Sequence, residues 1–201
     1  MPGQKRAKVK RSIPNLFTLG NAACGFSAII CAILSTTQPY LLSVSASLIF
    51  LSMVFDAFDG RVARTIGVTS DLGANLDSLC DAISFGIAPA VVLFQLLNGA
   101  VLTPLLWVAG VIYVGCAVYR LARFNVETGD HSEDAHLWFS GLPSTGAATV
   151  VALGVFALGL FSSTVAAYAI LGFTVAASFL MVSRIRFPHL NYFVRLVKRS
   201  K

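Results

Sequence analysis

"DAFDGRVARTIGVTSDLGANLDSLCD", residues 56–81, is the stretch that decides the fold. It concentrates five aspartates and two arginines in a chain of 201 residues that is 56% hydrophobic and only 12% charged. Long apolar segments flank it on both sides, and a helix needs about 20 apolar residues to cross a hydrocarbon core of about 30 Å. Because this composition is far from that of an average soluble domain, we predict an all-α integral membrane protein.

Six membrane-spanning helices are expected from the apolar stretches. These run over about 15–36, 41–55, 82–98, 101–119, 143–162 and 164–183, and the second continues as a polar helix to about residue 66. We expect the first to be a span and not a cleaved leader, because five more follow it directly. With no internal repeat, the chain is expected to form one six-helix domain, residues 13–186, between a basic N-terminal segment, 1–12, and a basic interfacial tail, 187–201.

The distribution of positive charge predicts the orientation in the membrane. All 15 lysines and arginines precede the first span or follow the second, fourth and sixth, whereas the connections "STTQPY" and "NGAVLTP" and the turn near "FSST" carry no charge. By the positive-inside rule, both termini and residues 56–81 then face the cytoplasm from the inner membrane. We interpret the net charge of +6 as attraction to anionic lipid headgroups and not as nucleic-acid binding.

Residues 56–81 are expected to form a helical hairpin that turns near Val68. One stripe on each helix faces the other: Asp56, Asp59, Gly60, Ala63 and Arg64 at i, i+3, i+4, i+7 and i+8, and Gly73, Asp77 and Asp81 at i, i+4 and i+8. Folding the hairpin places Asp56 opposite Asp81 and Asp59 opposite Asp77. Four carboxylates therefore converge between helices 2 and 3, near the cytoplasmic face.

This concentration of negative charge predicts bound cations. An isolated charge inside a membrane costs several kcal/mol, and two arginines cannot neutralise four carboxylates. Hard divalent cations with oxygen ligands can, and a pair of them about 3.5–4 Å apart suits phosphoryl chemistry. We therefore expect two Mg²⁺ or Mn²⁺ ions, with Arg64 donating two hydrogen bonds to a phosphate group. Gly60 and Gly73 are expected where a ligand or the neighbouring helix approaches the backbone. The alternative is an ion-paired hairpin without metal.

The pattern Asp56-x2-Asp59-Gly60-x2-Ala63-Arg64-x8-Gly73-x3-Asp77-x3-Asp81 resembles the signature of the CDP-alcohol phosphatidyltransferase family. The resemblance implies a six-helix membrane fold, usually dimeric, with two divalent metals. It also implies transfer of a phosphatidyl-type group from a CDP-linked lipid to an alcohol with loss of CMP.

The same resemblance implies roles for individual residues. Asp56, Asp59 and Asp77 would hold one metal, and Asp56, Asp77 and Asp81 the other, with Asp81 also the catalytic base. Contacts to the CDP portion of the lipid are expected from Gly60, Ala63, Arg64, Ser70 and Gly73. Asn15 and Thr18 are further candidates for nucleotide contacts, with helix capping and interhelical hydrogen bonding as the alternative.

Three other stretches indicate the acceptor alcohol. "IPNLFTLGNAACGF" (13–26), "YRLARFN" (119–125) and "FSGLPSTGAA" (139–148) are similar to the phosphatidylserine synthase branch of the family, although Thr145 departs from its pattern. The resemblance implies transfer from CDP-diacylglycerol to L-serine, a homodimer and a bilayer location. Arg120 and Arg123, with Asn125 beyond them, are candidates to bind the serine carboxylate, and positive-inside anchoring is their alternative role.

Several other functions stay open at this point. Within the family, the acceptor could be inositol phosphate, glycerol 3-phosphate or an amino alcohol, and the donor could carry archaeol. Outside it, a cation transporter would favour the bilayer midplane and inverted repeats, and an assembly protein would need no metal. The four cysteines lack C-x-x-C spacing, which argues against zinc or a disulfide framework.

Overall fold

The computed structural model describes residues 2–66, 71–129, 138–160, 163–183 and 186–188. Helices dominate these residues, as the predicted all-α class requires, and two strands of three residues each are an addition that the sequence did not predict. The elements are α1 (Pro2–Leu34), α2 (Tyr40–Ile66), α3 (Asp71–Asp81), the π-helix η1 (Ala82–Ile87), α4 (Ala88–Leu97), α5 (Thr103–Gly129), β1 (Trp138–Ser140), α6 (Ser144–Leu160), α7 (Thr164–Val182) and β2 (Arg186–Pro188).

Five helical segments of the described chain are long and apolar enough to cross a membrane, where six were predicted. They cover Asn15–Leu34, Tyr40–Val62, Leu72–Leu97, Thr103–Val126 and Thr164–Val182. The fifth predicted span, 143–162, corresponds to α6, a shorter apolar helix of 17 residues. At 1.5 Å per residue α6 is about 26 Å long, slightly less than a typical hydrocarbon core.

The third candidate span, Leu72–Leu97, begins ten residues before the apolar stretch predicted at 82–98. The carboxylates of α3 lower its average hydropathy, but the same helix exposes Leu72 and Leu79 at 72% and 67%. A helix with one apolar face and one acidic face can therefore continue directly into the apolar α4. The intervening π-helix η1 starts at the residue after Asp81.

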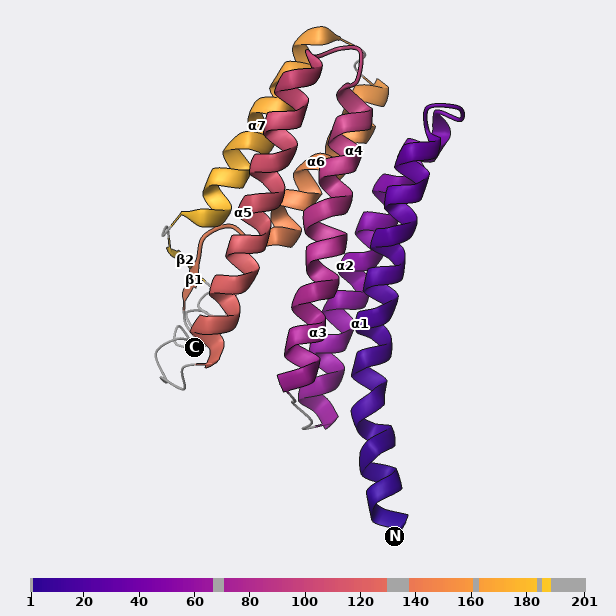
Figure 1. Cartoon of the computed structure of the whole chain (residues 1–201), viewed down its shortest axis with the longest axis vertical. Coiled ribbons are helices and arrows are strands. Elements are labelled where there is room, and N and C mark those ends of the chain that lie inside the picture. Colours follow the sequence, from indigo (N-terminus) through magenta and orange to yellow (C-terminus); the bar gives the residue numbers. More distant parts are fainter. Residues whose placement is uncertain (1, 67–70, 130–137, 161–162, 184–185, 189–201) are drawn as a thin grey trace, which may run out of the picture.

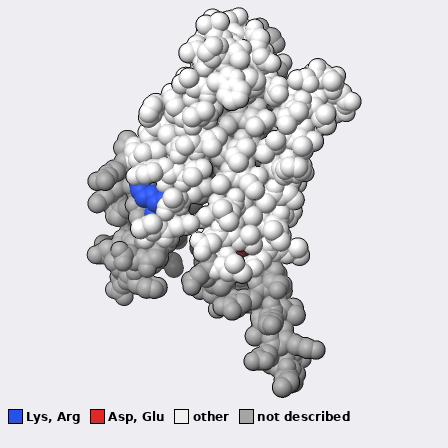
Figure 2. Space-filling model, in the orientation of Figure 1, with Lys and Arg blue, Asp and Glu red and all other residues white. Residues whose placement is uncertain are grey.

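Successive helices run in opposite directions, so α1 begins, α2 ends, α3 begins and α5 ends in the lower half of the molecule in Figure 1. The charged side chains of the described spans belong to this half: Asp56, Asp59, Arg61, Asp77, Asp81, Arg120 and Arg123. On the face shown in Figure 2, no charged atom lies at the opposite end, where α1 connects to α2. The charge asymmetry read from the sequence is thus present in the fold.

Small residues allow the first two helices to pack closely. Their contact is the most extensive between any two elements of the described chain, and Ala28, Ala32 and Ala46 are fully buried in it. The Ser45 hydroxyl donates a 2.6 Å hydrogen bond to the carbonyl of Ala28. Without a hydrophobic driving force in lipid, such close packing and hydrogen bonding hold membrane helices together.

The two short strands tie the connection after α5 to the end of α7. β1 pairs antiparallel with β2, and the following Leu142 N–H donates to the carbonyl of Leu180 at 3.0 Å. Gly141 has φ +84°, and a Cβ there would lie 2.5 Å from the carbonyl oxygen of Met181. Only glycine fits this position, which explains the "SGLP" sequence before α6.

Candidate active site

Three of the four predicted carboxylates form a cluster between α2 and α3. One carboxylate oxygen each of Asp56, Asp59 and Asp77 lies within 4.8 Å of the others. Asp59 is only 6% exposed, and the other two are half-buried. The i, i+3 spacing on α2 puts its two aspartates on one face, and the hairpin brings α3 alongside (Figure 1).

The unsatisfied oxygens of this cluster fit a hard cation. Oδ2 of Asp59 and Oδ1 of Asp77 are buried and have no hydrogen-bond partner in the described part of the chain. Leaving such an acceptor unsatisfied costs about 1–3 kcal/mol, and more when it is charged. An all-oxygen carboxylate set is what Mg²⁺ and Mn²⁺ prefer, so these residues suit a divalent ion of that kind.

Asp81 lies one turn beyond Asp77, outside the tight group. Its charge is nevertheless close enough to interact with Asp56 and Asp77. Its Oδ1 accepts a 2.9 Å hydrogen bond from Nδ2 of Asn21 on α1. Asn21 thus ties the Asp81 carboxylate of α3 to α1.

Asn21 is a site residue that the sequence reasoning missed. It lies three residues after Thr18, on the same face of α1, and both are buried. The hydroxyl of Thr18 hydrogen-bonds to Asp59. A polar i, i+3 pair in an otherwise apolar helix is the signal that could have identified this face of α1.

The candidate nucleotide contacts are placed unequally. Thr18 is 4% exposed and hydrogen-bonds to Asp59 on α2, which is the interhelical hydrogen bond named above as the alternative to a nucleotide contact. Asn15, one turn earlier, is half-buried. A Cβ at Gly60 would meet no atom of the described residues within 4 Å, so the neighbouring helix does not require glycine there. The space beside Gly60 is therefore open to a ligand. Gly73 is half-buried on α3.

Three other predicted contacts cannot be placed. Ser70 lies outside the described residues. Ala63 and Arg64 belong to the last turns of α2, but their side chains are outside the described part of the structure.

The two candidate acceptor arginines connect helices at the charged end. Nη1 of Arg120 donates to the Ser144 hydroxyl at 3.3 Å, at the first residue of α6. Nη1 of Arg123 donates to the carbonyl of Val182 at 3.3 Å, at the last residue of α7. Each arginine thus contributes to holding α5 against another helix.

Asn125 lies closer to the carboxylate helix than its sequence position suggests. Its Oδ1 accepts a 2.8 Å hydrogen bond from the hydroxyl of Ser78, the residue after Asp77. The end of α5 therefore contacts α3 beside the carboxylates. Of the three candidate acceptor residues, Asn125 is the one with a described contact to α3.

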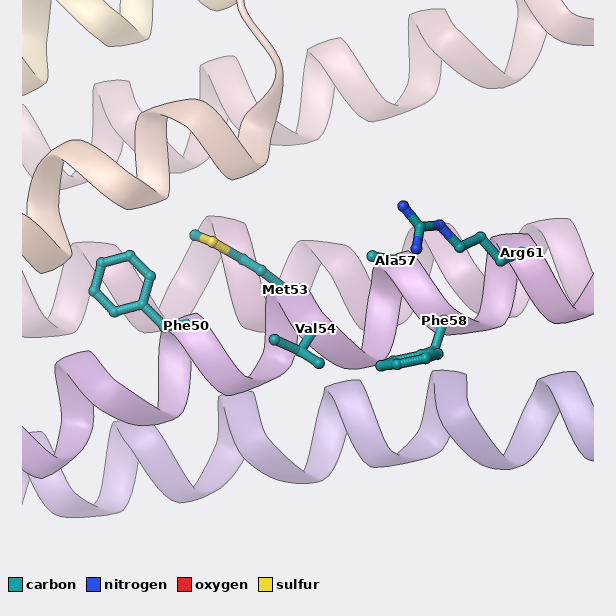
Figure 3. Close-up of a pocket in the computed structure, with 6 residues that line it drawn as sticks. All are labelled: Phe50, Met53, Val54, Ala57, Phe58 and Arg61. Carbon is teal, nitrogen blue, oxygen red and sulfur yellow. The ribbon is translucent and has the colours of Figure 1, made fainter.

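An apolar groove follows the outer face of α2 toward the carboxylate end. Its volume is about 470 Å³, and it is lined by Phe50, Met53, Val54, Ala57, Phe58 and Arg61. Figure 3 shows the apolar side chains in succession along the helix, with the guanidinium of Arg61 at the far end. A groove with this lining can hold a hydrocarbon chain whose polar end lies near the guanidinium of Arg61.

The fold and this site define a helical membrane protein with a carboxylate cluster suited to a divalent cation. The sequence model of the CDP-alcohol phosphatidyltransferase family matches residues 11–182. The chain therefore belongs to this family, which confirms the resemblance recognised in residues 56–81.

Several relatives with assigned names cover most of the chain. It is 35% identical over 191 residues to the CDP-diacylglycerol–serine O-phosphatidyltransferase of Mycobacterium leprae, covering 92% of this chain but 60% of that protein. It is 33% identical over 182 residues to the archaetidylserine synthase of Methanothermobacter thermautotrophicus (90% and 71%). It is 31% identical over 179 residues to the CDP-diacylglycerol–serine O-phosphatidyltransferase of Bacillus subtilis (88% and 90%).

Proposed function

We propose that this protein transfers a phosphatidyl group from CDP-diacylglycerol to the hydroxyl of L-serine, giving phosphatidylserine and CMP. The observation that carries the proposal is the three-carboxylate cluster with unsatisfied buried oxygens, formed by residues of the family signature. The names of the three relatives all specify serine, which favours serine over inositol phosphate or glycerol 3-phosphate. The archaetidylserine synthase supports an archaeol donor as the second candidate.

Two divalent ions are proposed for the site. Asp56, Asp59 and Asp77 would hold one, and Asp56, Asp77 and Asp81 the other. Mg²⁺ or Mn²⁺ bound there would neutralise the diphosphate of the donor and make CMP a better leaving group. The unsatisfied oxygens of Asp59 and Asp77 support this assignment.

Asp81 is proposed as the general base. Its carboxylate takes the proton of the serine hydroxyl while that oxygen forms the new bond to phosphorus and the bond from phosphorus to the CMP oxygen breaks. The hydrogen bond from Asn21 occupies one carboxylate oxygen and leaves the other for the proton. The proton later passes to water, which restores the carboxylate.

The donor is proposed to lie along α2. Its acyl part fits the apolar groove that ends at Arg61, and its nucleotide part fits the open space at Gly60. Further nucleotide contacts are proposed for the remaining signature and α1 residues: Ala63, Arg64, Ser70, Gly73, Asn15 and Thr18. In this arrangement Arg64 binds the diphosphate as a bidentate donor.

The acceptor is proposed to enter between α3 and the end of α5. The contact between Asn125 and Ser78 places this part of α5 against the carboxylate helix. Arg120 or Arg123 would then supply the guanidinium for the serine carboxylate.

The membrane arrangement completes the proposal. We propose α6 as an additional span, residues 13–186 as the catalytic domain, both termini in the cytoplasm and a homodimer in the inner membrane. A cytoplasmic site suits the chemistry, because CDP and serine are water-soluble groups while the acyl chains stay in the bilayer. Of the tail proposed as interfacial, 187–201, the first two residues belong to β2 and the remainder, 189–201, lies outside the described residues.

The test is CMP release by the purified protein in detergent–lipid micelles. CDP-diacylglycerol and CDP-archaeol are each offered with serine, ethanolamine, inositol phosphate and glycerol 3-phosphate. Serine is expected to be the fastest acceptor, and ethanolamine a poor one because it lacks the carboxylate. A rate with any other acceptor equal to that with serine contradicts the serine assignment but leaves the family unchanged.

A further inference from the structure

The side chain of Asn21 is fully buried, and its amide hydrogen-bonds to Asp81. We propose that Asn21 is a positioning residue that fixes the rotamer of the Asp81 carboxylate for its part in catalysis and cation binding. This inference rests on the role proposed above for Asp81. It assigns to α1 a function beyond packing.

The contact joins two distant parts of the chain with good geometry. Nδ2 of Asn21 lies 2.9 Å from Oδ1 of Asp81, across 60 residues of sequence. Asn21 is 0% exposed, so its side chain cannot rotate into solvent without moving α1. A hydrogen bond from a buried, immobile donor restricts the carboxylate far more than one from a surface side chain.

The backbone that carries Asn21 is held firmly against the turn that follows Asp81. The Ser84 hydroxyl donates to the carbonyl of Asn21 at 2.9 Å. One helical turn later, a Cβ on Gly25 would lie 2.7 Å from Cα of Ser84, so the two helices meet at backbone distance. The donor and the carboxylate are therefore fixed relative to each other.

The π-helix is held from its other side as well. The hydroxyl of Tyr113 on α5, itself fully buried, donates to the carbonyl of Phe85 at 3.0 Å. π-Turns inside helices are frequent at functional sites, because the widened turn redirects neighbouring side chains. Here η1 begins directly after Asp81, and contacts from α1 and α5 fix its position.

The amide of Asn21 is not needed to join these helices. Ser84 and Gly25 already supply the contact between α1 and η1. Moreover, Oδ1 of Asn21 is buried without a hydrogen-bond partner in the described part of the chain, a cost of about 1–3 kcal/mol. An apolar residue of similar size would avoid this cost. The presence of an amide here therefore points to a role for its N–H group, which donates a hydrogen bond to Asp81.

The experiment compares Asn21→Leu and Asn21→Ala with Ser45→Ala as the matched control. Ser45 on α2 is also fully buried and also makes an interhelical hydrogen bond, but to the carbonyl of Ala28 on α1, away from the carboxylates. Each purified variant is measured for kcat, for KM with CDP-diacylglycerol, for Mn²⁺ binding by electron paramagnetic resonance and for Tm. Mn²⁺ binding is read in the absence of substrate, independently of turnover.

Both Asn21 variants are expected to lose about ten- to a hundredfold in kcat and in affinity for the Mn²⁺ ion that Asp81 is proposed to hold. Losses of this size are typical when the hydrogen-bond partner of a metal ligand is removed. KM for the lipid is expected to stay unchanged, and Ser45→Ala is expected to alter Tm alone. Wild-type kcat and Mn²⁺ affinity in Asn21→Leu, or an equal loss in Ser45→Ala, would overturn the positioning role. If the wild-type protein itself binds no Mn²⁺, both the proposed metal site and the positioning role of Asn21 are wrong.

Discussion

Replacing Asp77 by Asn should change stability in opposite directions with and without metal. One carboxylate oxygen each of Asp56, Asp59 and Asp77 lies within 4.8 Å of the others. At that distance, two unit charges repel by about 3.5 kcal/mol with an effective dielectric constant of 20. The substitution removes two such pairs from the metal-free protein, although this figure is a ceiling because buried carboxylates can be relieved by protonation.

The expected result is a crossing of two melting curves. In chelator, Asp77→Asn should melt above the wild type, and each net kcal/mol gained corresponds to about 2–4 °C for a chain of this size. In Mn²⁺ at about 100 times its Kd, the wild type should gain about 2.7 kcal/mol, whereas the variant should gain little. Turnover by the variant should be lost in both conditions.

Thermal unfolding in detergent, with and without Mn²⁺, measures this crossing. Ser52→Ala serves as the control, because Ser52 is buried in α2 and hydrogen-bonds to the carbonyl of Ile49 in its own helix. It should respond to Mn²⁺ as the wild type does. A variant Asp77→Asn that melts below the wild type in chelator and gains the same stability from Mn²⁺ would refute the reasoning.

Three further predictions address packing, substrate and orientation. Gly25→Ala places a Cβ against Oγ and Cα of Ser84, so it should destabilise the fold by about 1–3 kcal/mol and slow turnover by displacing η1; wild-type Tm and rate would exclude a close contact there. Alanine at Arg120 or Arg123, whichever binds serine, should raise KM for serine about ten- to a hundredfold with lipid binding intact; no change in either variant removes both from the acceptor site. Cysteine labels at 37–40 should react only from outside the cell and labels at 126–135 only from the cytoplasm, and the reverse pattern would invert the topology.

The sequence was sufficient to predict the carboxylate cluster because two periodicities determine it. The i, i+3 and i, i+4 spacings put the aspartates on one face of each helix, and α2 and α3 follow each other closely enough in the sequence to lie side by side. The same aspartates concealed the start of the third span, because they lower the average hydropathy of α3. A helix was predicted over this segment, but its polar face kept the residues from Leu72 out of the apolar stretch predicted as the span.

Features that depend on how distant helices meet could not be predicted. Asn21 contacts Asp81 only because Gly25 allows α1 to approach η1, and no local pattern encodes that crossing. The pairing of β1 with β2 involves three residues on each strand, too few for a periodic signal. The hydrogen bonds of Arg120 and Arg123 to α6 and α7 likewise depend on tertiary packing.

The central claim is that the carboxylates between α2 and α3 bind the cations needed for transfer. A crystal structure of the protein soaked in Mn²⁺, with anomalous diffraction recorded at the manganese edge, tests it most directly. The account predicts two anomalous peaks, one contacting Asp56, Asp59 and Asp77 and the other contacting Asp56, Asp77 and Asp81. Absence of any peak at this cluster, in protein that releases CMP under the same metal conditions, would contradict it.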